Sequence, residues 1–120
     1  MNEDYVSFEV AKLLKEKGFD WACQAFYDKD RSLYISPVNT INDGIFDSDI
    51  ACPTIYMAQK WLRSRGCHVE VSYTNNDLWI YEILTIPYHD LVGLSDRIPT
   101  CYMSYEYALQ AGILEALKLI

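Results

Sequence analysis

The side chains with the most chemical potential are four cysteines and two histidines. The cysteines are separated by 29, 15 and 34 residues; they are Cys23, Cys52, Cys67 and Cys101. Structural zinc sites usually contain a close C-x-x-C pair, which this chain lacks. A zinc site assembled from Cys52, Cys67, Cys101 and His68 is therefore disfavoured, and we expect neither a metal ion nor a cofactor. We interpret the cysteines as free thiols, three of them in the core.

Nucleophilic catalysis would need a thiol or hydroxyl beside a histidine that an acid orients. His89 and Asp90 could partner Cys101 in space, but nothing local in the sequence enforces it, and a solvated loop histidine is the simpler interpretation. Three aspartates share one loop without the spacing of a calcium-binding hand, which favours a turn-forming role. They are Asp43, Asp47 and Asp49. We predict no catalytic residues, and a small hydrolase-like enzyme using His89 or a cysteine is the weakest alternative.

Tyrosine is the most distinctive residue type, with ten among 120 residues. It offers a large, rigid, amphipathic contact area, so surplus exposed tyrosine suits a binding surface. Five tyrosines lie at the expected ends of helices and strands or at positions expected to face solvent: Tyr34, Tyr56, Tyr88, Tyr102 and Tyr105. The one basic cluster is Lys60, Arg63 and Arg65. The simpler interpretation is a solvated helix face, and the alternative is a site for an anion or an acidic partner.

These aromatics and cations also allow a small-ligand sponge, for instance an anti-defence protein that sequesters a nucleotide signal. Tyrosines would stack on the base, and a lysine or arginine would meet the phosphate. The candidate ligand-binding residues are Tyr34, Tyr56, Lys60, Arg63, Tyr88, Arg97 and Tyr102. The five glycines are dispersed singly, so the chain has no glycine-rich phosphate loop.

Length and charge limit the remaining function classes. The 120 residues suffice for one α+β domain with one core. A formal charge of −7 disfavours general nucleic-acid binding and anionic membrane surfaces. No apolar run reaches the roughly 20 residues that span a bilayer, and the acidic N-terminus lacks the pattern of a secretory signal. We therefore expect a soluble, cytoplasmic protein.

The clearest structural signal runs from Thr54 to Tyr73. Between Ile55 and Arg65 apolar residues recur at helical spacing, which predicts an amphipathic helix, and Thr54 suits its N-cap. Gly66 suits the left-handed residue that ends it. From Cys67 to Tyr73 apolar and polar residues then alternate, which predicts a strand with one buried face.

A weaker copy of this pattern precedes it. Ser7 caps a first helix, Gly18 ends it, and Trp21 to Tyr27 and Arg31 to Ile35 read as a strand pair. After the second copy comes a strand at Leu78 to Ile86, and then a final helix that Ser104 caps. Gly112 inside that helix costs on the order of 1 kcal/mol against alanine, which is tolerable where a neighbour packs closely.

The element order is thus α-β-β-α-β-β-α, an antiparallel sheet of four strands with helices on one face. Residues 100–103 would add a short fifth strand at the edge. A long loop at 36–52 and an irregular stretch at 87–99 interrupt the pattern, and such segments often carry function.

The strand from Leu78 to Ile86 is apolar on both faces, with only Glu82 breaking the second face. A strand of that kind is usually covered on both sides. A homodimer or the long loop would supply the second cover, and we favour the homodimer.

Three blocks of the sequence resemble a known group of proteins. They are VSFEVAKLLKEKGFD, PTIYMAQKWLRSRGCHVEV and SYEYALQAGILEALKLI. These blocks are similar to segments of uncharacterised small proteins from gut Bacteroidetes and their phages and mobile elements. The similarity spans most of the chain and departs in the two irregular stretches. The resemblance implies a phage- or mobile-element-linked accessory protein in a bacterial host cell, and it assigns no residue a role.

The sequence therefore favours a small acidic protein that binds a protein or small-molecule partner without catalysis. The sponge and the enzyme remain the alternatives from other function classes.

Overall fold

The computed structural model of the chain describes residues 4–42, 49–74, 77–94 and 102–120. Three helices and six strands follow one another in the described ranges. They are α1 (Phe8–Glu16), β1 (Cys23–Tyr27), β2 (Leu33–Thr40), β3 (Ile50–Ala51), α2 (Ile55–Ser64), β4 (Cys67–Tyr73), β5 (Trp79–Thr85), β6 (Leu91–Leu94) and α3 (Tyr105–Leu119). The fold is α+β, as expected.

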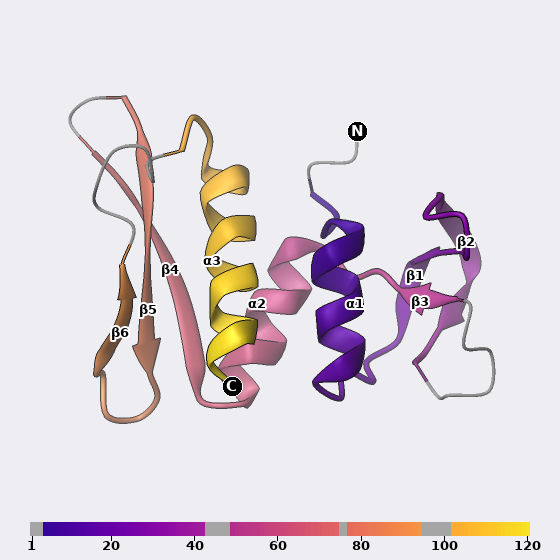
Figure 1. Cartoon of the computed structure of the whole chain (residues 1–120), viewed down its shortest axis with the longest axis horizontal. Helices are drawn as coiled ribbons and strands as arrows, with labels where there is room; N and C mark the ends of the chain where they lie inside the picture. Colours follow the sequence, from indigo (N-terminus) through magenta and orange to yellow (C-terminus); the bar gives the residue numbers. More distant parts are fainter. Residues whose placement is uncertain (1–3, 43–48, 75–76, 95–101) are drawn as a thin grey trace.

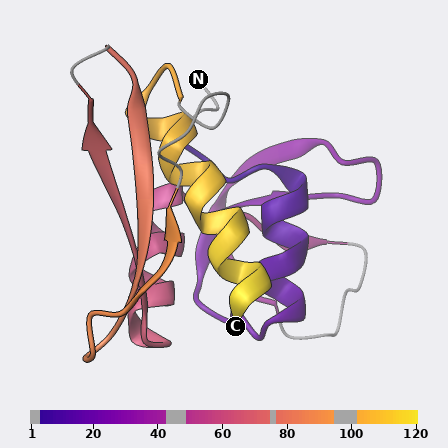
Figure 2. The same cartoon turned by 60° about the vertical axis from the view of Figure 1, so that its left-hand side comes forward.

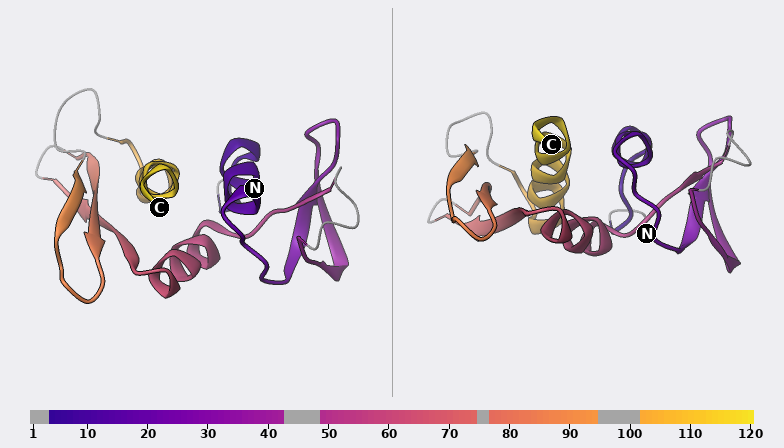
Figure 3. Two further views of the ribbon diagram at one scale, coloured as in Figure 1. Left: turned by 60° about the horizontal axis from the view of Figure 1, so that its bottom comes forward. Right: turned by 90° about the horizontal axis from the view of Figure 1, so that it is seen from below.

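The strands form two antiparallel sheets in place of the single sheet expected. The N-terminal sheet has the order β2-β1-β3 and the C-terminal sheet the order β4-β5-β6. Figure 1 shows them at opposite ends of the molecule with the helices between them, an arrangement that both views of Figure 3 repeat. The helices hold the two sheets apart, so each sheet packs one face on the same helical layer, and the molecule extends 44 × 31 × 20 Å.

The stretch expected to be a long loop at 36–52 contains strand residues at both of its ends. β2 continues to Thr40, and Ile50–Ala51 forms β3 against β1. The strand that follows α1 therefore becomes the centre of its sheet, whereas β4, which follows α2, lies at an edge. Residues 43–48 of the expected loop lie outside the described residues.

The irregular stretch expected at 87–99 also contains a strand. β6 pairs with β5 in the register Glu82 to Leu94 and Ile83 to Gly93. The turn between them contains a cis Ile86–Pro87 peptide bond. The fifth strand expected at 100–103 is reduced, within the described residues, to a single bridge between Tyr102 and Trp79.

The local signals for helix ends are confirmed. At the three N-caps, the side-chain oxygens of Ser7, Thr54 and Ser104 accept hydrogen bonds from the backbone N–H three residues on. Gly18 and Gly66 follow α1 and α2 with φ of 95° and 84°, a backbone conformation that glycine adopts without the Cβ penalty.

The C-terminal sheet places one face on α3 and leaves the other away from it. Val69, Val71, Tyr81 and Ile83 share the inner face in the register of β4 and β5. Gly112 of α3 contacts this face, and Figure 2 shows α3 lying along the sheet and beside α1. On the outer face Leu84 is only 6% exposed, and it pairs with His68 on one side and Leu91 on the other.

Candidate functional site

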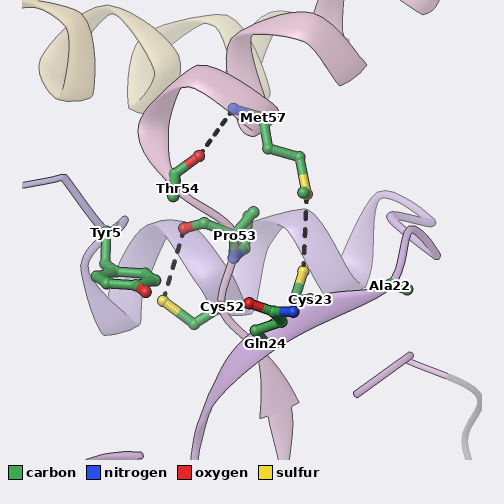
Figure 4. A pocket seen from close by; sticks show the side chains of 8 residues that line it. All are labelled: Tyr5, Ala22, Cys23, Gln24, Cys52, Pro53, Thr54 and Met57. Carbon is green, nitrogen blue, oxygen red and sulfur yellow. Dashed lines mark hydrogen bonds between the residues drawn. The ribbon is translucent and has the colours of Figure 1, made fainter. Parts of the chain in front are cut away.

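A pocket of about 280 Å³ lies where β1, the end of β3 and the start of α2 meet. Its lining is Tyr5, Ala22, Cys23, Gln24, Cys52, Pro53, Thr54 and Met57 (Figure 4). None of these side chains is an acid, a lysine, an arginine or a histidine. The pocket therefore offers sulfur atoms, neutral polar groups and apolar surface to a ligand.

Local folding explains how these residues meet. Cys52 directly follows β3, and its N–H donates to the carbonyl oxygen of Ala25 at 2.9 Å, which continues the pairing with β1. The chain then passes through Pro53 and enters α2, where Thr54 Oγ1 accepts from the N–H of Met57 at 3.1 Å. The cap thus fixes Met57 in the first helical turn, beside the strand that carries Cys23.

The two pocket cysteines are buried and weakly hydrogen-bonded. Cys23 Sγ lies 3.5 Å from the carbonyl oxygen of Trp21 and 3.9 Å from Sδ of Met57. Cys52 Sγ lies 3.4 Å from the carbonyl oxygen of Val6 and 3.7 Å from that of Pro53. Both thiols are 2% exposed or less.

Burial also sets the protonation of these thiols. It raises the pKa of Cys23 to about 12. The pKa of Cys52 is raised to about 12 first by burial and then by the charge of Cys23, while hydrogen bonds from its surroundings act in the opposite direction. A thiol that is protonated at neutral pH is a poor nucleophile, so this pocket suits binding better than covalent catalysis.

The candidate ligand-binding residues do not meet at this pocket. Tyr56, Lys60 and Arg63 share one side of α2 by their spacing, and all three are exposed. Tyr34 stacks on Phe26 in the N-terminal sheet. In the C-terminal sheet, Tyr88 is exposed after β5 and Tyr102 bridges Trp79. Arg97 lies outside the described residues, and Tyr105 packs edge-on against Trp79.

The residues considered for catalysis are also dispersed. His89 is exposed in the turn after β5, and its N–H donates to the carbonyl oxygen of Thr85. Cys67 and His68 point to opposite faces of β4, as expected, and burial raises the pKa of Cys67. Cys101, Asp43 and Asp47 lie outside the described residues. The prediction of buried free thiols is confirmed for Cys23, Cys52 and Cys67.

An exposed apolar surface lies at the other end of the molecule. Five of nine consecutive residues leaving β5 and forming β6 are apolar and exposed. This apolar surface consists of Ile86, Tyr88, Leu91, Val92 and Leu94, with exposed fractions from 43% to 79%. Most of this segment falls in the irregular stretch expected at 87–99, and Tyr88 is the one candidate ligand-binding residue in it.

The described residues also bear on metal sites and membrane-spanning helices. Within the described ranges, no group of three His, Cys, Asp or Glu side chains could hold a metal ion. Among the same residues, no helix has the length and apolar character needed to cross a membrane.

No protein-family model matches the chain, and no curated protein or solved structure shows significant similarity to it. Function must therefore be argued from the chain's own surfaces.

Proposed function

We propose that the chain is a non-catalytic binding protein that acts as a homodimer through the apolar surface of its C-terminal sheet. The observation that carries this proposal is the clustering of exposed apolar side chains from Ile86 to Leu94. Contiguous exposed apolar patches mark interaction sites on soluble proteins more often than scattered single residues do.

A second copy of the chain is the partner that this surface fits best. Two copies that each carry a formal charge of −7 repel one another, so they associate most readily through a surface without charge. The four residues of β6 are uncharged, and Leu91 and Leu94 are 54% and 43% exposed. A two-fold axis needs only one such patch, because the same residues contact each other from both sides.

The test is size-exclusion chromatography with light scattering over a range of concentrations. We expect a dimer mass of about 28 kDa, twice the 13.9 kDa of one chain. The double substitution Leu91→Glu and Leu94→Glu would place like charges across the axis, and we expect the dissociation constant to rise at least about tenfold.

The matched control is Ile35→Glu, which changes a 67% exposed apolar residue on β2 of the other sheet. This variant should remain dimeric. A monomer in the wild type at every concentration would contradict the homodimer. If the double variant remains dimeric and Ile35→Glu is monomeric, the interface lies on the N-terminal sheet and the proposed surface is wrong.

The nucleotide sponge has less support. It requires tyrosines and a cation around one cavity, whereas the pocket described above is lined by Tyr5 and by no lysine or arginine. A thermal shift with a nucleotide, lost in Lys60→Ala or Arg63→Ala, would favour the sponge over the proposed function.

From the resemblance of the three sequence blocks we also propose a biological setting: an accessory protein linked to phages or mobile elements in the bacterial cytoplasm.

A further inference from the structure

Three sulfur atoms from distant parts of the sequence line one pocket. Cys23 belongs to β1, Cys52 follows β3, and Met57 lies in the first turn of α2 (Figure 4). Sγ of Cys23 and Sδ of Met57 are 3.9 Å apart. Sγ of Cys52 belongs to the same pocket lining and points toward the carbonyl oxygen of Pro53, 3.7 Å away (Figure 4). This concentration of sulfur needs an explanation beyond core packing, because the pocket is also hollow.

Strand pairing makes a disulfide an unsuitable explanation. Cys52 stands opposite Ala25, so Cys23 is its diagonal neighbour on the same face. Diagonal neighbours in an antiparallel pair have Cα atoms about 7–8 Å apart, while a disulfide needs less than about 7 Å. The strands would have to move before the sulfurs could bond.

A shared metal ion suits the spacing better. Two sulfur ligands that each lie about 2.3 Å from one ion are about 4 Å apart. Cys23 and Met57 already have this separation, at 3.9 Å. To reach the same ion, Cys52 must rotate about its Cα–Cβ bond. The rotation breaks its long contacts with the carbonyl oxygens of Val6 and Pro53, at 3.4 Å and 3.7 Å, and its hydrogen bond with Tyr27, and the hollow of the pocket gives the side chain room to turn.

We propose that Cys23, Cys52 and Met57 form a binding site for a soft, thiophilic metal ion such as Cu(I). Thiolate and thioether ligands select Cu(I), whereas harder ions prefer the carboxylate and imidazole groups that this lining lacks. The N-terminal end of α2, capped by Thr54, also favours negative charge on the adjacent Cys52. On binding, each cysteine releases its proton to solvent and Met57 stays neutral, so the Cu(I) complex carries one negative charge.

The test titrates the reduced, full-length protein with Cu(I) in the absence of oxygen, against a coloured chelator that competes for the ion. Bound copper and ultraviolet thiolate-to-copper absorption are the two readouts. We expect the wild type to take one ion per chain and the double variant Cys23→Ser, Cys52→Ser to take none. Met57→Leu conserves the side-chain volume, so it should fold normally and bind at least about tenfold more weakly.

The matched control replaces the other two cysteines, Cys67→Ser and Cys101→Ser, and should bind as the wild type does. Circular dichroism checks the fold of each variant. The proposal is overturned if the chelator keeps all copper from the wild type, if the control loses the ion, or if Met57→Leu binds as tightly as the wild type. The result is independent of the proposed homodimer, because the apolar surface lies on the other sheet.

Discussion

Gly112 determines how closely α3 approaches the C-terminal sheet. A Cβ built at this position would stand 2.5 Å from Cγ1 of Val69 and 3.0 Å from Cγ of Tyr81. The sequence showed only that a glycine inside the helix costs stability relative to alanine. The structure supplies the compensating contact that was expected there, since the sheet packs directly against the helix backbone.

We predict that Gly112→Ala lowers the free energy of unfolding by about 1–3 kcal/mol. Overpacking against Val69, which is fully buried, outweighs the gain of about 1 kcal/mol in helix propensity. Urea unfolding measures the change. Lys118→Ala, an exposed position on the same helix, should alter stability by less than about 0.5 kcal/mol. A more stable Gly112→Ala would show that the sheet can yield at this point.

At the scale of single elements, the helices begin and end where short-range chemistry places them. Thr54 gives the clearest case, because its oxygen accepts from Met57 while the residue also bridges Tyr5. The β-strands depend less on local signals. β6 is four residues long and occurs in a stretch interrupted by Pro87 and Gly93, so its pairing with β5 determines it more than its own sequence does.

We predict that Thr54→Ala destabilises the protein by about 1 kcal/mol, because it leaves an N–H of the first turn of α2 without its cap. Thr54→Ser retains the oxygen and should lie within a few tenths of a kcal/mol of the wild type. Urea denaturation compares the three proteins. Equal losses in both variants would instead attribute the effect to the threonine methyl group.

At the scale of the whole molecule, the helices join two separate sheets into one core. Buried residues of α1, α2, α3 and both sheets form a single continuous cluster. Phe19 and Trp61 meet edge-on within it, at 5.6 Å between ring centroids. Both sheets contribute buried residues to this one cluster, so we expect neither half to be stable without the shared helical layer.

This arrangement predicts one cooperative unfolding transition. Ile113 is fully buried on α3, and Ile113→Ala should lower stability by about 2–5 kcal/mol. Tryptophan fluorescence can follow the halves separately in two background variants. Trp79→Phe leaves Trp21 and Trp61 as reporters of the N-terminal half and the helical layer, and the double variant Trp21→Phe, Trp61→Phe leaves Trp79 as the reporter of the C-terminal sheet. When all proteins are measured at one concentration, Ile113→Ala should lower the midpoint of urea unfolding by the same amount in both background variants. Two transitions with only one shifted would show that the halves unfold independently.

The candidate pocket was only partly accessible from the sequence. Burial of the thiols followed from their place among alternating apolar residues, and the helix start at Thr54 was also predicted. The meeting of Cys23 and Met57, 34 residues apart, was not. It depends on β3 pairing with β1, and a two-residue strand inside an apparent loop gives no periodic signal.

The sequence by itself determined the α+β class, the three helix caps and the left-handed glycines Gly18 and Gly66, because these depend on neighbours within a few residues. Only the tertiary structure decided that the strands divide into two sheets, which residues form the apolar surface, and which sulfur-containing residues line one pocket. Those features depend on which strands pair and on where the helices pack. Both depend on contacts between segments that are far apart in the sequence, so local patterns do not determine them.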